Sequence, residues 1–202
     1  MKIIGITGGV GAGKSEVLKM IAELCSCRII IADEAAHQLE EPGEACYQPL
    51  LDLLGAEILN PDQTINKQKM AAKIFEEDGE ERLKAVNQII HPAVKQYITA
   101  EIEKERTLGQ VDYFWIEAAL LIEDGYTAIC DELWYIYAKR EIREQRLKES
   151  RGYSDEKIAG IMKAQSDEET FRKHCRVIID NSGDMEQTRR QLRKLLQSTS
   201  RK

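Results

Sequence analysis

One glycine-rich segment near the start of the chain, from Gly8 to Ser15, constrains the fold more than any other feature. Its residues read G-G-V-G-A-G-K-S and fit the phosphate-binding loop pattern G-x-x-x-x-G-K-[ST]. The apolar run Ile3–Ile6 before it predicts a strand, and the helical spacing of apolar residues over Glu16–Leu24 predicts a helix after it. A strand, a glycine loop and a helix in this order surround a phosphate group with backbone N–H groups and the positive end of the helix dipole.

The residue types in this loop suit a nucleoside triphosphate. Glycines let successive N–H groups turn toward a phosphate because no Cβ stands in the way. Lys14 can reach the β- and γ-phosphates, and the Ser15 hydroxyl can bind Mg²⁺. We therefore predict a nucleotide site with these contact residues: Gly9, Gly11, Ala12, Gly13, Lys14, Ser15 and Glu16.

The overall composition limits the classes of partner. The 202 residues suffice for one domain with a smaller inserted lobe, and the hydrophobic fraction of 43% is enough for a core. The formal net charge of −6 argues against nucleic acid as the main partner, because binding its backbone needs an excess of Lys and Arg. The longest nearly apolar run, Val111–Ile122, contains acidic residues and is too short to span a bilayer, so we expect no membrane partner.

The five cysteines form no recognisable disulfide or metal framework. Their number is odd, and none stands in a C-x-x-C arrangement. Isolated thiols of this kind are typical of a reducing compartment, and the chain opens directly into a predicted strand rather than a signal peptide. We therefore expect a cytoplasmic protein.

Four further β-branched or aromatic runs predict strands. They are Arg28–Ala32, Asp112–Ile116, Glu132–Tyr137 and Arg176–Ile179. Helical segments separate the strands, which predicts an α/β fold of the P-loop NTPase type, with a five-stranded parallel sheet in a three-layer arrangement.

Two long helical stretches interrupt this pattern and predict a lobe and a lid within the single domain 1–202. About eighty residues separate the second and third strands, far more than one crossover helix needs, so a helical lobe is expected at about 34–108. Its predicted helices are Glu34–Glu41, Ala45–Leu54, Asn66–Glu76 and Glu80–Arg106. The His91-Pro92 pair predicts a break or a kink in the last of these. A second helical stretch, rich in Arg and Lys, predicts a lid at about 139–173.

Carboxylates at two predicted strand ends are candidates for chemistry, because the C-terminal ends of parallel strands face the ligand. Asp33 follows the second strand and is either a general base for an attacking hydroxyl or the N-cap of the next helix. Glu117 follows the third strand and is either part of a Mg²⁺ shell, often through water, or an ion-pair partner of Lys14 or of a residue in the lobe.

Basic residues in the predicted lid can neutralise charge on a transferring phosphoryl group. Their helical spacing places several arginines on one face: Arg140, Arg143 and Arg146, with Arg151 after them. Interleaved glutamates leave open a solvated, salt-bridged helix instead. A guanine-nucleotide switch needs the motif N-K-x-D, which specifies guanine. Asn66-Lys67 is followed by Gln68-Lys69 and lacks the Asp, so the sequence disfavours such a switch.

Taken in order, these residues resemble the dephospho-coenzyme A kinase family from the first strand to about Gly183. The family opening T-G-G-x-G-x-G-K-S stands here as Thr7 to Ser15. Further matches follow along the chain: Ala32-Asp33 of D-A-D, Pro42-Gly43, Asp62 to Met70 with Ile74-Phe75, His91-Pro92, Leu120-Leu121 and Glu123 of P-L-L-x-E, Gln165, and Ile179 to Gly183 of I-x-N-x-G.

The resemblance implies ATP- and Mg²⁺-dependent phosphorylation of the ribose 3′-hydroxyl of dephospho-coenzyme A, the last step of coenzyme A synthesis. It implies that Asp33, Lys14 and Arg146 are catalytic, that Ser15 and Glu117 hold the metal, and that Asn181 lies by the adenine. It also assigns the acceptor to the central lobe and to these residues: Thr7, Asp33, His91, Leu120 and Glu123. We expect a monomer or a weak homo-oligomer.

The chain departs from the family pattern at several positions. Ile31 replaces the first Asp of D-A-D, Lys67 replaces an Arg, Ala119 replaces a Pro, and Arg176 stands where Asp is usual. In the lid pattern Q-x-x-R-L-x-x-R, Arg143 stands for Gln and Ser150 for the second Arg, with Arg151 beside it. Two alternatives remain open: a P-loop kinase of another nucleoside, nucleotide or sugar acid, and a non-catalytic ATP-binding regulator. The presence of both Asp33 and Lys14 argues against the regulator, because binding alone does not need a base.

Overall fold

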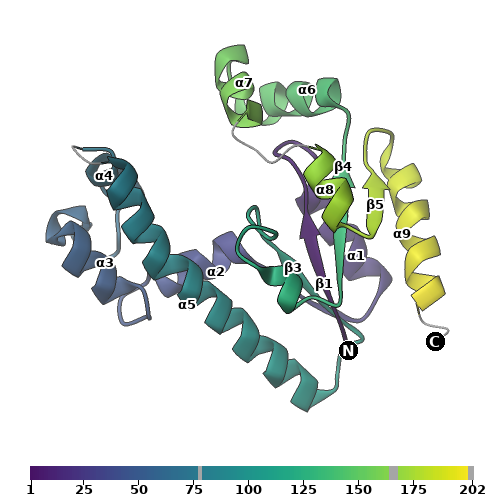
Figure 1. The fold of residues 1–202 in the computed structure, drawn as a ribbon, viewed down its shortest axis with the longest axis horizontal. Helices are drawn as coiled ribbons and strands as arrows, with labels where there is room; N and C mark the ends of the chain where they lie inside the picture. Colours follow the sequence, from purple (N-terminus) through teal and green to yellow (C-terminus); the bar gives the residue numbers. More distant parts are fainter. Residues whose placement is uncertain (77–78, 164–167, 200–202) are drawn as a thin grey trace. The chain divides into compact units, whose positions relative to one another are not determined.

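The computed structural model describes residues 1–76, 79–163 and 168–199 (Figure 1). The chain divides into two compact units, which we describe separately. Unit 1 comprises Met1–Ile29 with Glu105–Lys202, and unit 2 comprises Ile30–Lys104.

A five-stranded sheet forms the centre of unit 1 (Figure 1). Its strands are β1 (Lys2–Thr7), β2 (Cys27–Ile31), β3 (Tyr113–Glu117), β4 (Glu132–Tyr137) and β5 (Val177–Asp180), in the order β2-β3-β1-β4-β5. Strand β1 pairs in parallel with β3 and β4, and β4 pairs in parallel with β5. Parallel pairing brings the residues after β1, β3, β4 and β5 to one edge of the sheet. The predicted α/β fold with a parallel sheet is confirmed.

The central strands are apolar on both faces, as expected for a sheet covered by helices on both sides. In β1, Ile3, Ile4 and Ile6 are all buried. The indole rings of Trp115 in β3 and Trp134 in β4 meet edge to face, with centroids 5.0 Å apart. Burial on both faces explains why these strands read as continuous rather than alternating apolar runs.

Unit 1 also contains these helices: α1 (Lys14–Leu24), α6 (Arg140–Arg151), α7 (Asp155–Lys163), α8 (Glu168–His174) and α9 (Met185–Thr199), with a 3₁₀ turn, η2 (Tyr126–Ala128). Of these, α8 packs on β4 and α9 on β5. Helix α9 packs beside α1, and Arg189 forms an ion pair with Glu23 across them at 2.6 Å. Phe171 of α8 stacks on the ring of Tyr135 in β4, with centroids 4.8 Å apart. Gln165, matched to the family pattern, lies outside the described residues.

Unit 2 is helical. Its elements are α2 (Ala32–Leu39), α3 (Tyr47–Leu54), the 3₁₀ turn η1 (Ala56–Ile58), α4 (Lys67–Ile74) and most of α5 (Gly79–Leu108). The side-chain oxygen of Asn66 accepts hydrogen bonds from the backbone N–H groups of Gln68 and Lys69, both at 3.0 Å, and so caps α4. Asn66 and Lys67 therefore begin a helix and belong to no guanine-binding motif.

Helix α5 runs through Pro92, so of the predicted break or kink at His91-Pro92 the break does not occur. A proline inside a helix costs about 3 kcal/mol through its lost N–H bond and its clash with the preceding turn. The apolar stripe of Val86, Val94, Ile98 and Ile102 is buried on both sides of the proline. Packing of this stripe holds the two halves of the helix together, as most helical stability in proteins comes from such packing.

The described residues contain no helix that is both long and apolar enough to cross a bilayer.

Candidate active site

The glycine loop joins β1 to α1 and takes a backbone path that glycine allows. Gly11 and Gly13 have φ angles of +82° and +85°, in the left-handed region that disfavours other residues. A Cβ on Gly11 would lie 2.8 Å from the carbonyl oxygen of Arg143, and a Cβ on Gly13 would lie 2.5 Å from Nδ2 of Asn181. The loop is therefore packed closely against α6 and the segment after β5.

Lys14 places its ammonium group at the beginning of this loop. Its Nζ donates to the carbonyl oxygen of Gly8 at 2.9 Å and lies 3.3 Å from Oε1 of Glu117. The side chains of Lys14 and Glu117 are only 15% and 13% exposed, so solvent screens this pair weakly. The ion pair between Glu117 and Lys14 is thus present, and it leaves the Glu117 carboxylate beside the loop.

The oxygen donors near the loop suit Mg²⁺. Ser15 is exposed at the start of α1, and its hydroxyl and the Glu117 carboxylate are both hard oxygen ligands. Within the described residues, no group of three or more His, Cys, Asp or Glu side chains can hold a metal. A metal bound by Ser15 and Glu117 therefore needs further oxygens from nucleotide phosphates. Glu16 is also exposed, and its carboxylate pairs with Lys19 at 2.7 Å, which leaves its backbone for phosphate contact.

Asn181, which follows β5, is buried, and its backbone N–H, its Nδ2 and its Oδ1 all form hydrogen bonds. Its backbone N–H donates to the carbonyl oxygen of Tyr137 at 2.7 Å, and its Nδ2 donates to that of Ala12 at 2.7 Å. Its Oδ1 accepts from the hydroxyl of Thr188 at 2.8 Å. Asn181 thereby ties the segment after β5 to the glycine loop.

Thr188 is a member of the site that sequence reasoning missed. It is completely buried on α9, four residues before the buried Leu192. A hydroxyl-bearing residue on the apolar stripe of a helix is the signal that could have found it, because a buried hydroxyl needs a hydrogen-bond partner.

Arg146 of α6 spans the same two segments. Its Nη1 donates to the carbonyl oxygen of Ala12 at 3.3 Å, and its Nη2 donates to that of Asn181 at 2.9 Å. The next residue, Leu147, is buried and anchors the helix. Arg151 is exposed, with its guanidinium 5.8 Å from the ring centre of Tyr153.

Arg143, one helical turn before Arg146, also contacts the loop. Its Nε donates to the carbonyl oxygen of Val10 at 2.9 Å, and its guanidinium lies against Gly9. Burial lowers the pKa of Arg143, although an arginine stays protonated under all relevant conditions. The structure thus brings two of the predicted lid arginines onto the glycine loop, while Arg140 is exposed and paired with Glu144 at 2.7 Å.

Three of the residues predicted to bind the acceptor belong to unit 1. Thr7, at the end of β1, is buried, and its hydroxyl has no hydrogen-bond partner among the described residues. Leu120 and Glu123 lie in the turn after β3, where Leu120 is 45% exposed and Glu123 is exposed as well. An exposed leucine and a buried hydroxyl left without a partner are both compatible with ligand contact.

Asp33 belongs to unit 2, and its position in the structure differs from both predicted positions, the strand end and the N-cap. Strand β2 ends at Ile31, which is itself the N-cap of α2 and makes no side-chain cap bond. Asp33 therefore lies in the first turn of the helix, neither at the strand end nor at the N-cap. Its side chain is exposed and has no hydrogen bond or ion pair with any described residue.

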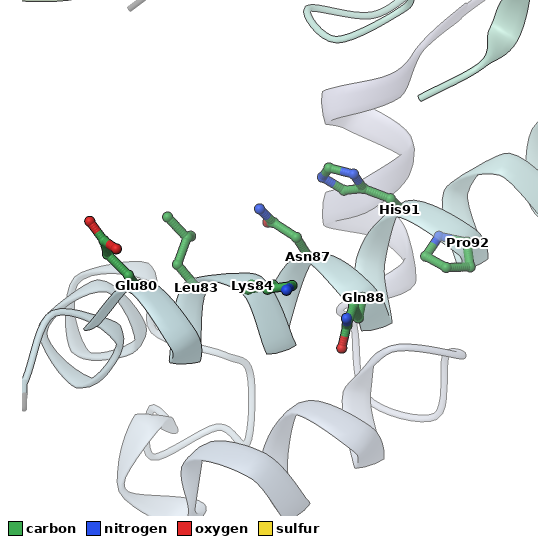
Figure 2. Close-up of a pocket in the computed structure, with 7 residues that line it drawn as sticks. All are labelled: Glu80, Leu83, Lys84, Asn87, Gln88, His91 and Pro92. Carbon is green, nitrogen blue, oxygen red and sulfur yellow. The ribbon is translucent and has the colours of Figure 1, made fainter. Parts of the chain in front are cut away.

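His91 lines an open cavity of about 490 Å³ along one face of α5 (Figure 2). The remaining lining residues are Glu80, Leu83, Lys84, Asn87, Gln88 and Pro92. Figure 2 shows Glu80, Leu83, Asn87 and His91 pointing to the same side of the helix. Of these lining residues, the sequence predicted only His91 as a site residue, although helical spacing backward from it leads to most of the others.

This fold and this loop define a P-loop phosphotransferase. The family model described as "Dephospho-CoA kinase" matches residues 2–187. A dephospho-CoA kinase of Carboxydothermus hydrogenoformans is 36% identical over 197 residues, which cover 98% of this chain and 94% of the relative. The chain therefore belongs to the dephospho-CoA kinase family, as its sequence motifs predict.

Solved structures share the fold of this chain. A Thermus thermophilus protein, TT1252, superimposes with a TM-score of 0.80 at 26% identity and covers 98% of this chain and 97% of its own. The dephospho-CoA kinase of Campylobacter jejuni shares the fold with a TM-score of 0.73 at 21% identity, covering 99% of this chain and 98% of its own.

The buried bond between Thr188 and Asn181 yields a stability prediction. Thr188→Val keeps the shape but leaves Oδ1 of Asn181 without its donor, so the free energy of unfolding should fall by about 1–3 kcal/mol. Urea denaturation measures this change. Thr99→Val is the control, since Thr99 is exposed and donates only to the carbonyl of Lys95 in its own helix at 2.8 Å. Equal losses in the two variants would contradict the importance of the buried bond.

Proposed function

We propose that this chain transfers the γ-phosphoryl group of ATP to the ribose 3′-hydroxyl of dephospho-coenzyme A and yields coenzyme A and ADP. The observation that carries the proposal is the Lys14 ammonium held between the Gly8 carbonyl and Glu117 in a loop with left-handed glycines. Such a loop cradles phosphates through its backbone N–H groups, and its lysine offsets their charge. Family membership supports the choice of acceptor.

In the proposed reaction, the 3′-oxygen of the acceptor forms a bond to the γ-phosphorus, and the bond between that phosphorus and the β–γ bridging oxygen breaks. ADP leaves with the electron pair, and the hydroxyl proton passes to the Asp33 carboxylate. Asp33 suits this role because its carboxylate is exposed and without a partner among the described residues. Mg²⁺ held by Ser15 and Glu117 would offset the negative charge of the phosphates.

The acceptor is proposed to bind to unit 2 through the groove along α5 that includes His91. Leu83 gives this groove an apolar contact, and Asn87 and Lys84 give it hydrogen-bond donors, a combination that suits a long molecule with amide and phosphate groups. Thr7, Leu120 and Glu123 are proposed to contact the acceptor from unit 1. The adenine of ATP is proposed to lie by Asn181.

Cellular location and assembly belong to the proposal as well. All five cysteines are free thiols, which supports a reducing, cytoplasmic location. A small acceptor and a net charge of −6 support a protein without nucleic acid or membrane partners. We propose a monomer or a weak homo-oligomer.

An assay of ADP release tests the function directly. With ATP and Mg²⁺, release should depend on dephospho-coenzyme A, and coenzyme A should form in equal amount. Release that responds instead to another nucleoside, nucleotide or sugar acid would identify a different kinase. Tight ATP binding with no transfer to any acceptor would identify a regulator and refute the proposal.

Asp33→Asn tests the proposed base. Asparagine keeps the shape but cannot take the proton, so kcat should fall by roughly 10²–10⁴-fold while KM for both substrates changes little. Steady-state kinetics with each substrate varied in turn measure this split. Glu34→Gln is the control, since Glu34 is the adjacent exposed acid of α2. Near-normal kcat in Asp33→Asn would remove Asp33 from the mechanism.

Arg146 should matter more than Arg151. Arg146 holds the carbonyl groups of Ala12 and Asn181, whereas Arg151 is exposed and precedes Gly152. Arg146→Ala should lower kcat and kcat/KM for ATP together, by at least about tenfold, because it loses two charged hydrogen bonds. Arg151→Ala should change both by less than about threefold, as expected for a surface residue. Measurements at saturating dephospho-coenzyme A decide between them, and a larger loss in Arg151→Ala would reverse the ranking.

A further inference from the structure

Two arginines of α6 contact the glycine loop at different places. Arg143 reaches the carbonyl oxygen of Val10, and Arg146 reaches that of Ala12. Both residues project from one face of the helix because they are three positions apart. The two guanidinium groups contact different parts of the loop backbone.

The guanidinium of Arg146 is committed to the protein. Both of its Nη atoms donate to backbone carbonyls, one of Ala12 and one of Asn181. An arginine bonded in this way shapes the loop and the segment after β5. Arg146 is therefore a positioning residue, which acts on ATP through the backbone it holds.

The guanidinium of Arg143 lies on the loop itself. Its Nε bonds to Val10, and its Cζ and Nη2 lie so close to Gly9 that a Cβ at this position would overlap them. Gly9 thus permits a cation to approach the loop backbone closely. Arg143 also lines a cavity of about 340 Å³ at the C-terminal end of β4, with Tyr137 and Lys139 among the other lining residues.

Lys14 and Arg143 flank the same end of the loop. The Lys14 ammonium bonds to Gly8, and the Arg143 guanidinium covers Gly9, the next residue. A lysine at this motif position reaches the β- and γ-phosphates. The Arg143 guanidinium therefore lies beside the residue next to the one that the lysine of the motif contacts.

We propose that Arg143 is a catalytic residue whose guanidinium contacts the γ-phosphoryl group of ATP during transfer. This inference rests on the proposed function, because it assigns a role within the same site. The guanidinium is partly withdrawn from water, so a phosphate oxygen offers it a strong charge-assisted hydrogen bond. Charge that develops on the phosphoryl group strengthens this bond in the transition state.

The charged and titratable groups that face Arg143 come from three elements. They are Tyr135 of β4, Arg140 and Glu144 of α6, and Glu168 of α8. The two glutamates are paired with other arginines, Glu144 with Arg140 and Glu168 with Arg172, each at 2.7 Å.

Arg143→Gln is the test variant, because glutamine keeps a polar side chain of similar reach but carries no charge. Its kcat with dephospho-coenzyme A should fall by roughly 100-fold, the effect of removing one donor to developing charge. Its affinity for ATP should fall by at least about tenfold, while its affinity for ADP, which lacks the γ-phosphate, should change by less than about threefold. Calorimetric titration gives both affinities.

Lys148→Gln is the matched control, since Lys148 is an exposed cation on the same helix and pairs with Asp155 at 2.5 Å. It should leave kcat and both affinities within about twofold of the starting protein. Arg143→Lys restores the charge without the planar fork and should bind ATP more tightly than Arg143→Gln. It also serves as the test variant if Arg143→Gln does not fold, as judged by circular dichroism.

Equal losses of ATP and ADP affinity in Arg143→Gln would overturn the inference and make Arg143 a loop-shaping residue like Arg146. Unchanged kcat and affinities would also overturn it. If the starting protein does not phosphorylate dephospho-coenzyme A, the proposed function fails, but the difference between ATP and ADP affinity still decides the role of Arg143.

Discussion

The outward-facing carbonyl groups of the glycine loop are the constraint on which the rest of the site depends. A loop that turns its N–H groups toward a phosphate must turn carbonyl groups away from it, and buried carbonyls need donors. Some donors are local: Lys14 for Gly8, the N–H of Ala12 for Gly9 and the N–H of Val17 for Gly13. The others come from distant segments: Arg143 of α6 for Val10, and Arg146 of α6 with Asn181 for Ala12. The loop keeps its shape because these donors are in place before a nucleotide binds, and a preformed set of N–H groups costs little reorganisation when it meets charge.

The sheet order makes this convergence possible. Strand β1 lies between β3 and β4, and β5 lies next to β4, so the segments that follow all of these parallel strands meet at one edge. The segment after β3 starts from Glu117, the one after β4 leads into α6, and the one after β5 carries Asn181. The buried hydroxyl of Thr188 in α9 donates a hydrogen bond to Oδ1 of Asn181. A change in any of these packed segments therefore reaches the phosphate loop through one or two hydrogen bonds.

The sequence was most informative where function depends on local chain geometry. The glycine loop, the strands and the parallel sheet follow from short patterns, because neighbouring residues alone decide whether a loop can turn its N–H groups inward. Contacts between distant segments could not be predicted from such short patterns. Helical spacing placed Arg143 and Arg146 on one face, but which carbonyl each reaches depends on packing across more than a hundred residues of chain. Similarly, the buried stripe of α5 continues the helix through Pro92, where a break or a kink was predicted. Asp33 lies in a helix rather than at a strand end because β2 ends at Ile31. Local propensity gives way to packing in both cases.

The charged residues proposed to act in the reaction differ in how many hydrogen bonds and ion pairs they form within the protein. Arg146 gives both of its Nη atoms to carbonyl groups, so little of its hydrogen-bonding capacity remains for a ligand. Lys14 shares its ammonium between a carbonyl and Glu117, an ion pair that incoming phosphates can replace with stronger partners. Asp33 in the first turn of α2 has no hydrogen bond or ion pair with any described residue. A carboxylate that must accept a proton needs lone pairs not already engaged by N–H donors, because each such bond favours the charged form and weakens it as a base. The exposed position of Asp33 meets this requirement. At the N-cap, its carboxylate oxygens would instead accept hydrogen bonds from the backbone N–H groups of the first helical turn.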